Sequence, residues 1–220
     1  MTTEPIGTGE RALTGDPGRR IRADGARTRT AILDAAAALA TVDGLDGLSI
    51  NSLADHIGIS KSGLFAHFRS KEALQLATVA HARAIFDADV VTPVLAVREP
   101  GLETVEALMD HYLDHLERRV FPGGCFFAST LAELRMRPGP VTSALVDFDA
   151  TWLGLLRRHL ALARDRGEIR PDEDLEALLF EIESHALHAH LRFSARNDAR
   201  ALGRARTAIH RRLDEAALDD

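Results

Sequence analysis

The apolar positions of this chain recur at helical spacing, and no segment alternates with the period of two that a β-strand requires. Between residues 28 and 41 they form one helical face, and the same spacing returns after each glycine or proline interruption. Further helices are predicted over residues 71–89, 105–116, 125–134, 141–160, 172–194 and 198–216. We therefore expect an all-α fold.

Two short helical patterns lie on either side of one glycine within residues 49–71. The first has apolar residues at i, i+3, i+4 and i+7, namely Ile50, Leu53, Ala54 and Ile57. Ser49 is a candidate N-cap, and Gly58 can take the left-handed conformation that ends a helix. Ser60 begins the second pattern, in which Leu64 and Phe68 face the first helix. This arrangement predicts a helix-turn-helix.

The first turn of the second helix leaves Lys61, Ser62 and Gly63 on the outer surface, where a recognition helix contacts base edges. Glycine inside a helix costs about 1 kcal/mol relative to alanine. Gly63 either lets the backbone approach a thymine methyl or a phosphate closely, or merely kinks a surface helix.

Lys71 falls in the first turn of the following helix if Ser70 is its N-cap. The helix dipole disfavours a cation there. A phosphate at the same place would accept hydrogen bonds from the free N–H groups and from the ammonium. Lys71 is therefore predicted to contact a nucleic acid.

The segments LADHIGIS (residues 53–60) and LFAHFRSKEAL (residues 64–74) resemble the amino-terminal DNA-binding domain of TetR-type (TetR/AcrR) transcriptional repressors. The resemblance covers about residues 27–75 and weakens beyond them. It implies that Lys61, Ser62 and Gly63 lie over bases. It places Phe65, His67 and Lys71 along the phosphate backbone. The family usually has a tyrosine at position 65 that reaches a phosphate, so Phe65 is left to pack against a sugar or base face or to serve the core.

The predicted organisation is a disordered arm at 1–22, a helix-turn-helix DNA-binding domain at 23–75, and a ligand-binding and dimerisation domain at 76–220. Arg19, Arg20 and Arg22 either form a solvated linker or reach a phosphate or the minor groove. For Arg29 we favour a phosphate contact. The candidate DNA-binding residues are Arg29, Ser60, Lys61, Ser62, Gly63, Phe65, His67 and Lys71.

The net charge of −6 is unevenly distributed. Residues 1–75 contain nine Lys/Arg and nine Asp/Glu, whereas residues 76–220 contain 18 and 24. An acidic body discourages DNA binding through the wrong face. The single cysteine, Cys125, and the lack of a secretory signal or long apolar run predict a cytoplasmic protein with no membrane partner.

Two histidine pairs have spacings that can place both imidazoles on one metal: His111 with His115, and His185 with His188. Neither pair has a nearby cysteine pair or carboxylate that completes a zinc motif, so structural or pocket-lining roles are favoured over metal binding. We expect no metal and no cofactor.

An enzymatic site would need a nucleophile, a base and an orienting group together. Ser129, Thr130 and Glu133 follow Cys125, but they form no defensible triad. Cys125 lies beside two phenylalanines, where an apolar environment raises the thiol pKa and favours a buried structural role. We expect no catalytic residues.

Bulky residues on the helices between the DNA-binding domain and the last two helices are candidates for an apolar ligand pocket. They are Met109, Tyr112, Phe126, Phe127, Trp152 and His185. Alternatively, these side chains simply fill a core. The helices at 172–194 and 198–216 are predicted to pair with their symmetry mates as a four-helix bundle, with Ala201, Ala205 and Ala208 allowing a close crossing.

These features together favour a ligand-responsive transcriptional regulator, a repressor, rather than an enzyme. It would bind double-stranded DNA at a palindromic operator as a homodimer and be released by a small hydrophobic effector. Two alternatives stay open. One is an α-helical enzyme whose helix-turn-helix resemblance is incidental, and the other is a metal-sensing regulator.

Overall fold

The computed structural model describes the backbone of residues 17–134 and 137–218, and side chains within those ranges from Gly25 onward except that of Leu134. These described residues form helices and contain no β-strand. One isolated antiparallel bridge joins Ile169 to Ala217. The all-α prediction is confirmed. Most of the predicted arm, residues 1–16, lies outside the described residues.

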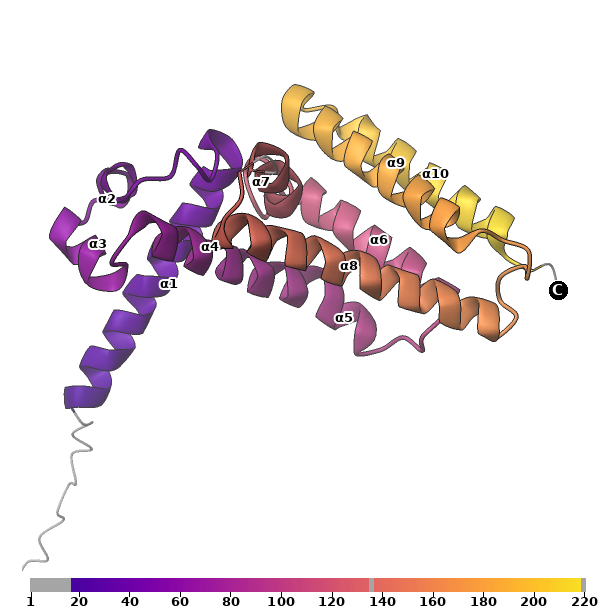
Figure 1. The fold of residues 1–220 in the computed structure, drawn as a ribbon, viewed down its shortest axis with the longest axis horizontal. Coiled ribbons are helices and arrows are strands. Elements are labelled where there is room, and N and C mark those ends of the chain that lie inside the picture. The colour runs from indigo at the N-terminus through magenta and orange to yellow at the C-terminus, as the bar shows by residue number, and fades with distance from the viewer. Residues whose placement is uncertain (1–16, 135–136, 219–220) are drawn as a thin grey trace, which may run out of the picture.

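The amino-terminal domain consists of α1 (Pro17–Asp43), α2 (Ile50–Ile57), α3 (Lys61–His67) and the start of α4 (Lys71–Phe86), and it occupies one end of the elongated molecule (Figure 1). The prediction placed the start of α1 too late. Residues 17–22, which we assigned to the arm, form its first turns, because proline is accommodated at a helix start. The side chains of Arg19, Arg20 and Arg22 lie outside the description.

Helix α4 does not end near residue 89 as predicted but continues through a π-helical segment, η1 (Asp87–Val91), into α5 (Thr92–Leu95). Pro93, which we expected to interrupt the helix, lies in the first turn of α5, where its missing N–H is tolerated. π-Helical segments often mark functional sites. Phe86 lies at this junction and is buried.

The carboxy-terminal domain contains α6 (Leu102–Glu117), α7 (Phe126–Leu134), α8 (Pro140–Asp165), α9 (Leu175–Arg196) and α10 (Ala199–Ala216). Helix α9 starts at Leu175 and not at Pro171, because the Asp174 side chain accepts the N–H groups of Glu176 and Ala177. Asp198 precedes α10 as predicted, but its carboxylate accepts from Arg192 and makes no capping hydrogen bond.

Helices α9 and α10 run side by side along one edge of the carboxy-terminal domain, from beside α7 toward the end of the molecule away from α2 and α3 (Figure 1). One continuous apolar core extends from α1 to α10 and contains Ile32, Leu64, Phe86 and Leu213 among its buried side chains. No described helix combines the length and the apolar character needed to cross a bilayer.

Candidate functional site

The turn between α2 and α3 is built from local hydrogen bonds that the sequence encodes. Ser49 accepts the N–H of Ser52 at 3.0 Å and completes a capping box. Gly58 has φ 72°, and its N–H donates to the carbonyl of Ala54. Ser60 accepts the N–H of Gly63 at 3.1 Å. These caps fix where α3 begins and therefore which side chains its first turn presents.

Helix α3 has one buried side and one exposed side. Leu64 is buried on its inner face, and Phe68 is buried just past its end, at the C-cap position. Lys61 and Ser62 are exposed. Phe65 is 50% exposed, so it does not serve the core of the described chain. The structure thus places the predicted base-contacting residues on one outward surface.

Gly63 lies inside α3, one turn from the serine that caps the helix. Among the described residues, a Cβ at this position would come within 4 Å of one atom, Ser60 Oγ, at 3.1 Å. The helix continues through the glycine from its cap to His67. An alanine would require the Ser60 hydroxyl, which caps the helix, to shift by a few tenths of an ångström, and close approach to DNA would be a second reason for glycine.

Arg29, expected on the phosphate backbone, is engaged inside the domain. Its guanidinium lies 4.3 Å from the centre of the Phe68 ring and donates to the carbonyl of His67 at 3.0 Å. This contact ties α1 to the end of α3. Arg29 thus positions the recognition helix, and its predicted contact with phosphate stays a proposal.

Lys71 begins α4, with Ser70 as its N-cap, as the sequence predicted. Its ammonium donates to the carbonyl of Asp46 and lies 3.6 Å from the Asp46 carboxylate. Asp46 also pairs with Arg137, whose hydrogen bond is the main cause that lowers the pKa of the Asp46 carboxyl. Lys71 and Asp46 are about half exposed, so a phosphate could compete for the ammonium.

The loop between α1 and α2 is held from the carboxy-terminal domain. Glu133, in the last turn of α7, accepts the N–H groups of Leu45 at 2.8 Å and Asp46 at 2.9 Å. Gln75 of α4 donates to the carbonyl of Leu45 at 2.7 Å. The sequence predicted no connecting role for Glu133. The structure makes it a direct connection between the two domains.

A cavity of about 330 Å³ lies in the carboxy-terminal domain, and we call it the aromatic pocket. Its lining comprises Phe86, Tyr112, Cys125, Phe127, Ala128, Leu131, Ala132, Phe148, Asp149, Trp152, Glu183 and Leu187. Three of the predicted ligand residues, Tyr112, Phe127 and Trp152, are therefore brought together.

The other three predicted ligand residues do not line the aromatic pocket. Met109 and Phe126 are fully buried in the apolar core and are not part of the pocket lining. His185 is exposed and lines a separate hollow between α9 and α10, together with His188. A helical periodicity places a residue on a face but does not say what that face contacts.

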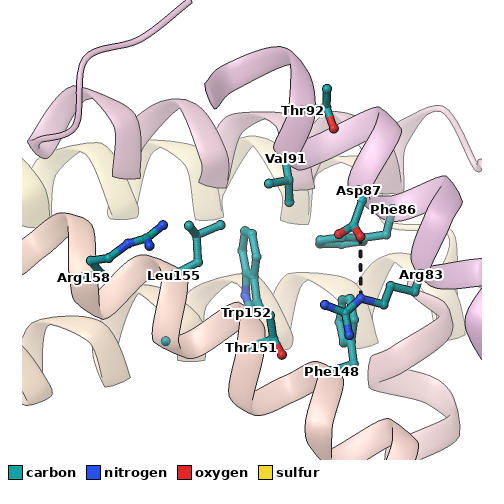
Figure 2. A pocket seen from close by; sticks show the side chains of 11 residues that line it. Arg83, Phe86, Asp87, Val91, Thr92, Phe148, Thr151, Trp152, Leu155 and Arg158 are labelled. Carbon is teal, nitrogen blue, oxygen red and sulfur yellow. Dashed lines mark ion pairs between the residues drawn. The ribbon is translucent and has the colours of Figure 1, made fainter. Parts of the chain in front are cut away.

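A second hollow, the α4–α8 groove, has a volume of about 490 Å³ and includes Arg83, Asp87, Thr151 and Arg158 in its lining. Arg83 and Asp87 form an ion pair at 3.6 Å (Figure 2). Phe86, Phe148 and Trp152 line this groove and the aromatic pocket alike. Figure 2 shows Trp152 extending from α8 toward Phe86, whose ring centre is 5.3 Å away. These three rings form the shared wall.

Two carboxyl groups line the aromatic pocket, and neither was selected from the sequence. The indole N–H of Trp152 donates to Glu183 at 2.8 Å. Burial raises the pKa of Glu183 to about 7, an effect that the Trp152 hydrogen bond opposes and the nearby Asp149 carboxylate reinforces. Burial also raises the pKa of Asp149. The sequence did contain a signal, since Glu183 and Asp149 each lie four residues after a buried leucine on an otherwise apolar helix face.

The two histidine pairs lie in different surroundings: His111 and His115 lie on α6 near Asp89, whereas His185 and His188 are exposed on α9. His115 is buried and shares a 2.6 Å hydrogen bond with Asp89, while burial lowers the pKa of its imidazole. In the described part of the chain, the side chains that could jointly hold a metal are Glu106, Asp110 and His210, and neither predicted pair belongs to that set. Arg206 already donates to Asp110 at 2.6 Å.

Comparisons with known proteins agree with this architecture. The family model described as bacterial regulatory proteins, tetR family, matches residues 32–78, and the one described as tetracyclin repressor-like, C-terminal domain, matches residues 101–209. None of the curated protein sequences compared with the chain matches it significantly.

Solved structures of similar proteins cover most of the chain. A TetR transcriptional regulator from Chloroflexus aurantiacus J-10-FL is 26% identical, with a TM-score of 0.77 over 89% of this chain and 98% of that one. AibR, solved with isovaleryl coenzyme A and operator DNA, is 24% identical, with a TM-score of 0.63 over 82% and 98% of the two chains. A regulator from Saccharomonospora viridis, solved with choline, is 16% identical, with a TM-score of 0.70 over 89% and 100%.

Both matched segments coincide with the domains described above, and the first includes the capped helix-turn-helix. The second includes most of the residues that line the aromatic pocket. The chain belongs to the TetR family of transcriptional regulators, with an amino-terminal helix-turn-helix DNA-binding domain and a carboxy-terminal ligand-binding domain.

Proposed function

We propose that this regulator is a repressor that binds a palindromic operator as a homodimer and leaves it when a small effector fills the aromatic pocket. The observation that supports this best is the outward first turn of α3, where Lys61 and Ser62 are exposed above a buried Leu64. A helix with one packed side and a short polar outer turn suits the major groove.

The dimer proposal depends on the outer surface of α9. Phe180, Leu187 and Leu191 are 74%, 48% and 56% exposed, and their spacing of seven and four residues places them along one side of the helix. Exposed apolar residues on one face mark an interaction surface, and a closed homodimer buries such a face against its own copy. Of the small residues predicted at the crossing, Ala201 and Ala205 are instead buried within the protomer, because α10 packs them against its own α9, and Ala208 is left partly exposed for a close crossing.

A dimer across α9 and α10 would present two α3 helices, one from each protomer, related by the two-fold axis. In Figure 1, α2 and α3 lie at one end of the protomer, whereas α9 and α10 run along its edge from beside α7 toward the other end. Two-fold symmetry of the protein then requires two inverted half-sites in the DNA, with their centres one helical turn, about 34 Å, or a multiple of it apart.

Two connections support release of DNA by a ligand. Helix α7 forms one wall of the aromatic pocket through Phe127 and Leu131, and its last turn holds the α1–α2 loop through Glu133. Helix α4 contributes Phe86 to the pocket and begins with Lys71 at the proposed DNA surface. A ligand that displaces either helix would alter the position of α3. To change a population from 99% bound to 99% free, it must favour the released conformation by about 5.5 kcal/mol.

The family relationship alone does not identify the effector. AibR was solved with isovaleryl coenzyme A and the Saccharomonospora viridis regulator with choline, which are chemically unlike. The lining residues of this chain must therefore decide the ligand. An enzymatic role for Cys125 is disfavoured, because burial raises the pKa of its thiol and so suppresses the thiolate.

Selection of bound duplexes from a randomised DNA library tests this proposal. We expect the selected sequences to contain an inverted repeat. Titration followed by fluorescence anisotropy should then show two protomers bound per operator. Lys61→Ala should then weaken binding to the selected sequence. Binding without sequence preference at physiological salt would contradict the proposal. Loss of operator binding after dialysis against a chelator would favour the metal-sensing alternative.

A further inference from the structure

We propose that the aromatic pocket selects an organic cation, a quaternary or protonated amine on an apolar body, with the Glu183 carboxylate as its counter-ion. This proposal specifies the ligand class that the sequence left as a small hydrophobic molecule. It rests on the proposed function in taking this pocket as the effector site. The charge of the lining, its aromatic rings and its capacity to release a proton support it separately.

The charge of the lining has one sign. Asp149 and Glu183 contribute carboxyl groups, and within the described part of the chain the residues that line the pocket include no lysine, arginine or histidine. The basic residues Arg83 and Arg158 line the α4–α8 groove instead, on the other side of the shared aromatic wall. An anionic ligand would meet like charges without a basic partner, whereas a cation would find a counter-ion.

Five aromatic side chains line the same cavity: Phe86, Tyr112, Phe127, Phe148 and Trp152. Phe127 and Phe148 stack with ring centres 3.3 Å apart, and Phe86 meets Phe148 and Trp152 edge-on, with ring centres at 5.1 and 5.3 Å. The π-faces of aromatic rings attract cations, and quaternary ammonium groups are bound in aromatic-lined sites. A neutral apolar ligand would use the rings but not the carboxylates.

The position of Glu183 is held by a donor that does not neutralise it. Trp152 donates one hydrogen bond to Oε1 at 2.8 Å, and Trp152 is itself buried in the shared wall. This bond orients the carboxyl group at the cavity without supplying a positive charge. A bound cation would supply the missing charge, and a structural carboxylate in the same place would more often be paired with arginine or lysine.

Proton release provides a signature for this assignment. The titratable groups that face Glu183 are Tyr112 from α6, Cys125 before α7 and Asp149 from α8. Burial raises the pKa of Tyr112 and of Cys125, so both stay neutral near pH 7. Because the pKa of Glu183 is about 7, much of the free protein carries a proton there.

A cation favours the ionised carboxylate, so binding displaces that proton. The affinity for a cation should therefore fall as the pH drops below the Glu183 pKa, by about tenfold per unit at the limit. Above that pKa the affinity should level off. A neutral ligand displaces no proton and should show no such dependence.

The test uses the full-length protein without DNA and follows Trp152, the single tryptophan of the chain. The probes are benzyltrimethylammonium and 2-methyl-1-phenylpropan-2-ol, a neutral analogue with carbon in place of nitrogen and hydroxyl in place of one methyl. At pH 8 we expect the cation to bind at least tenfold more tightly than the alcohol. At pH 6 that preference should shrink severalfold.

Glu183→Gln retains an oxygen acceptor for the Trp152 N–H but loses the charge, so it should abolish both the preference and its pH dependence. Asp149→Asn should reduce the preference in part. Arg158→Gln, in the lining of the α4–α8 groove, is the matched control and should change neither. The pH comparison on the unaltered protein needs no variant, so it remains decisive if one fails to fold.

Three results would overturn the proposal: equal or tighter binding of the alcohol at pH 8, an undiminished preference in Glu183→Gln, or no response to the cation at millimolar concentration. Operator binding is measured separately by anisotropy. A protein that keeps the cation preference but finds no operator would refute the proposed repressor function alone, and a repressor without the preference would refute this assignment alone.

Discussion

The DNA-binding surface and the aromatic pocket are built in opposite ways. The proposed DNA-binding surface comes mainly from one continuous stretch, residues 49–71, whose caps and turn are local and whose proposed contact residues include the exposed Lys61 and Ser62. The pocket takes residues from α4, α6, α7, α8 and α9, between Phe86 and Leu187, and its functional groups point inward. A substitution in the local DNA-binding surface should therefore change one measured property, whereas a substitution in the pocket should change several properties together.

Glu133 connects the two regions by two short hydrogen bonds to backbone N–H groups. A carboxylate that accepts two backbone N–H groups is a strong and directional contact. The neighbouring Ala132 lines the pocket. Glu133 is therefore one of the connections between the two regions, beside α4, and substitutions on each side of it should separate effects on DNA binding from effects on ligand binding.

The largest expected effect comes from the surface that would join two copies. Phe180→Glu combined with Leu191→Glu places charges on the exposed side of α9, which should leave the protomer folded but prevent dimerisation. Operator affinity should fall by about 10²–10⁴-fold, because the second half-site no longer binds intramolecularly. Sedimentation and anisotropy measure both properties.

Val97→Glu is the matched control, since Val97 is 80% exposed and follows α5, away from α9. It should leave assembly and DNA binding unchanged. A double variant that stays dimeric, or a monomer that binds the operator with full affinity, would contradict the proposed interface.

Lys61→Ala tests whether the local site acts at one base position. Loss of this side chain should cost about 1–3 kcal/mol of operator binding and relax the preference at one position in each half-site. A selection from randomised operators measures the preference at every position. A uniform loss across all sequences would instead place Lys61 on the phosphate backbone.

Glu133→Ala tests the connection between the regions. It removes the acceptor for the N–H groups of Leu45 and Asp46, so stability should fall by about 1 kcal/mol and ligand-induced release should weaken. The ratio of operator Kd values with and without benzyltrimethylammonium measures that release.

Glu103→Ala serves as its control, because Glu103 is an exposed carboxylate paired with Arg98 at the start of α6. If Glu133→Ala left the ratio of Kd values unchanged, the connection between the pocket and the α1–α2 loop would have to run through α4 alone.

Gly63→Ala separates folding from DNA binding within α3. Alanine should gain up to about 1 kcal/mol of helix propensity, but its Cβ would lie 3.1 Å from the Ser60 Oγ that caps the helix, so the net change in stability should be smaller. Operator affinity should nevertheless fall, since the added methyl would meet the DNA. Thermal unfolding measures the effect on stability, and anisotropy measures the effect on operator affinity. Unchanged affinity would favour the alternative that Gly63 merely kinks a surface helix.

Gly58→Ala is the opposite case and a useful comparison. Gly58 has φ 72°, where alanine costs about 1 kcal/mol or more. That variant should lose stability first and DNA binding only as a consequence.

Lys71→Ala should have the smallest effect. A phosphate contact is blind to sequence, so binding should weaken about equally for all DNA and the salt slope should fall by about 1. Measurement of operator Kd over a range of salt concentrations gives that slope. An unchanged slope would indicate that Lys71 makes no phosphate contact and stays paired with Asp46, as in this structure.

The sequence by itself determined the all-α class, the helix-turn-helix and its caps at Ser49, Gly58, Ser60 and Ser70. These features depend on neighbours within one or two turns, so residue type and spacing are enough to specify them. The start of a helix follows less directly from the sequence where two residues could each begin it. Pro171 suggested an earlier start for α9, but the Asp174 side chain made the capping hydrogen bonds.

Only the tertiary structure decided which inward-facing residues line a cavity. Periodicity placed Met109 and Tyr112 on one face of α6, but packing buried the first in the core and left the second at the pocket. The same holds for Glu183, whose pKa depends on α8 supplying Trp152 and Asp149. A cavity is the space that several helices fail to fill together, and its volume and charge depend on residues far apart in the chain.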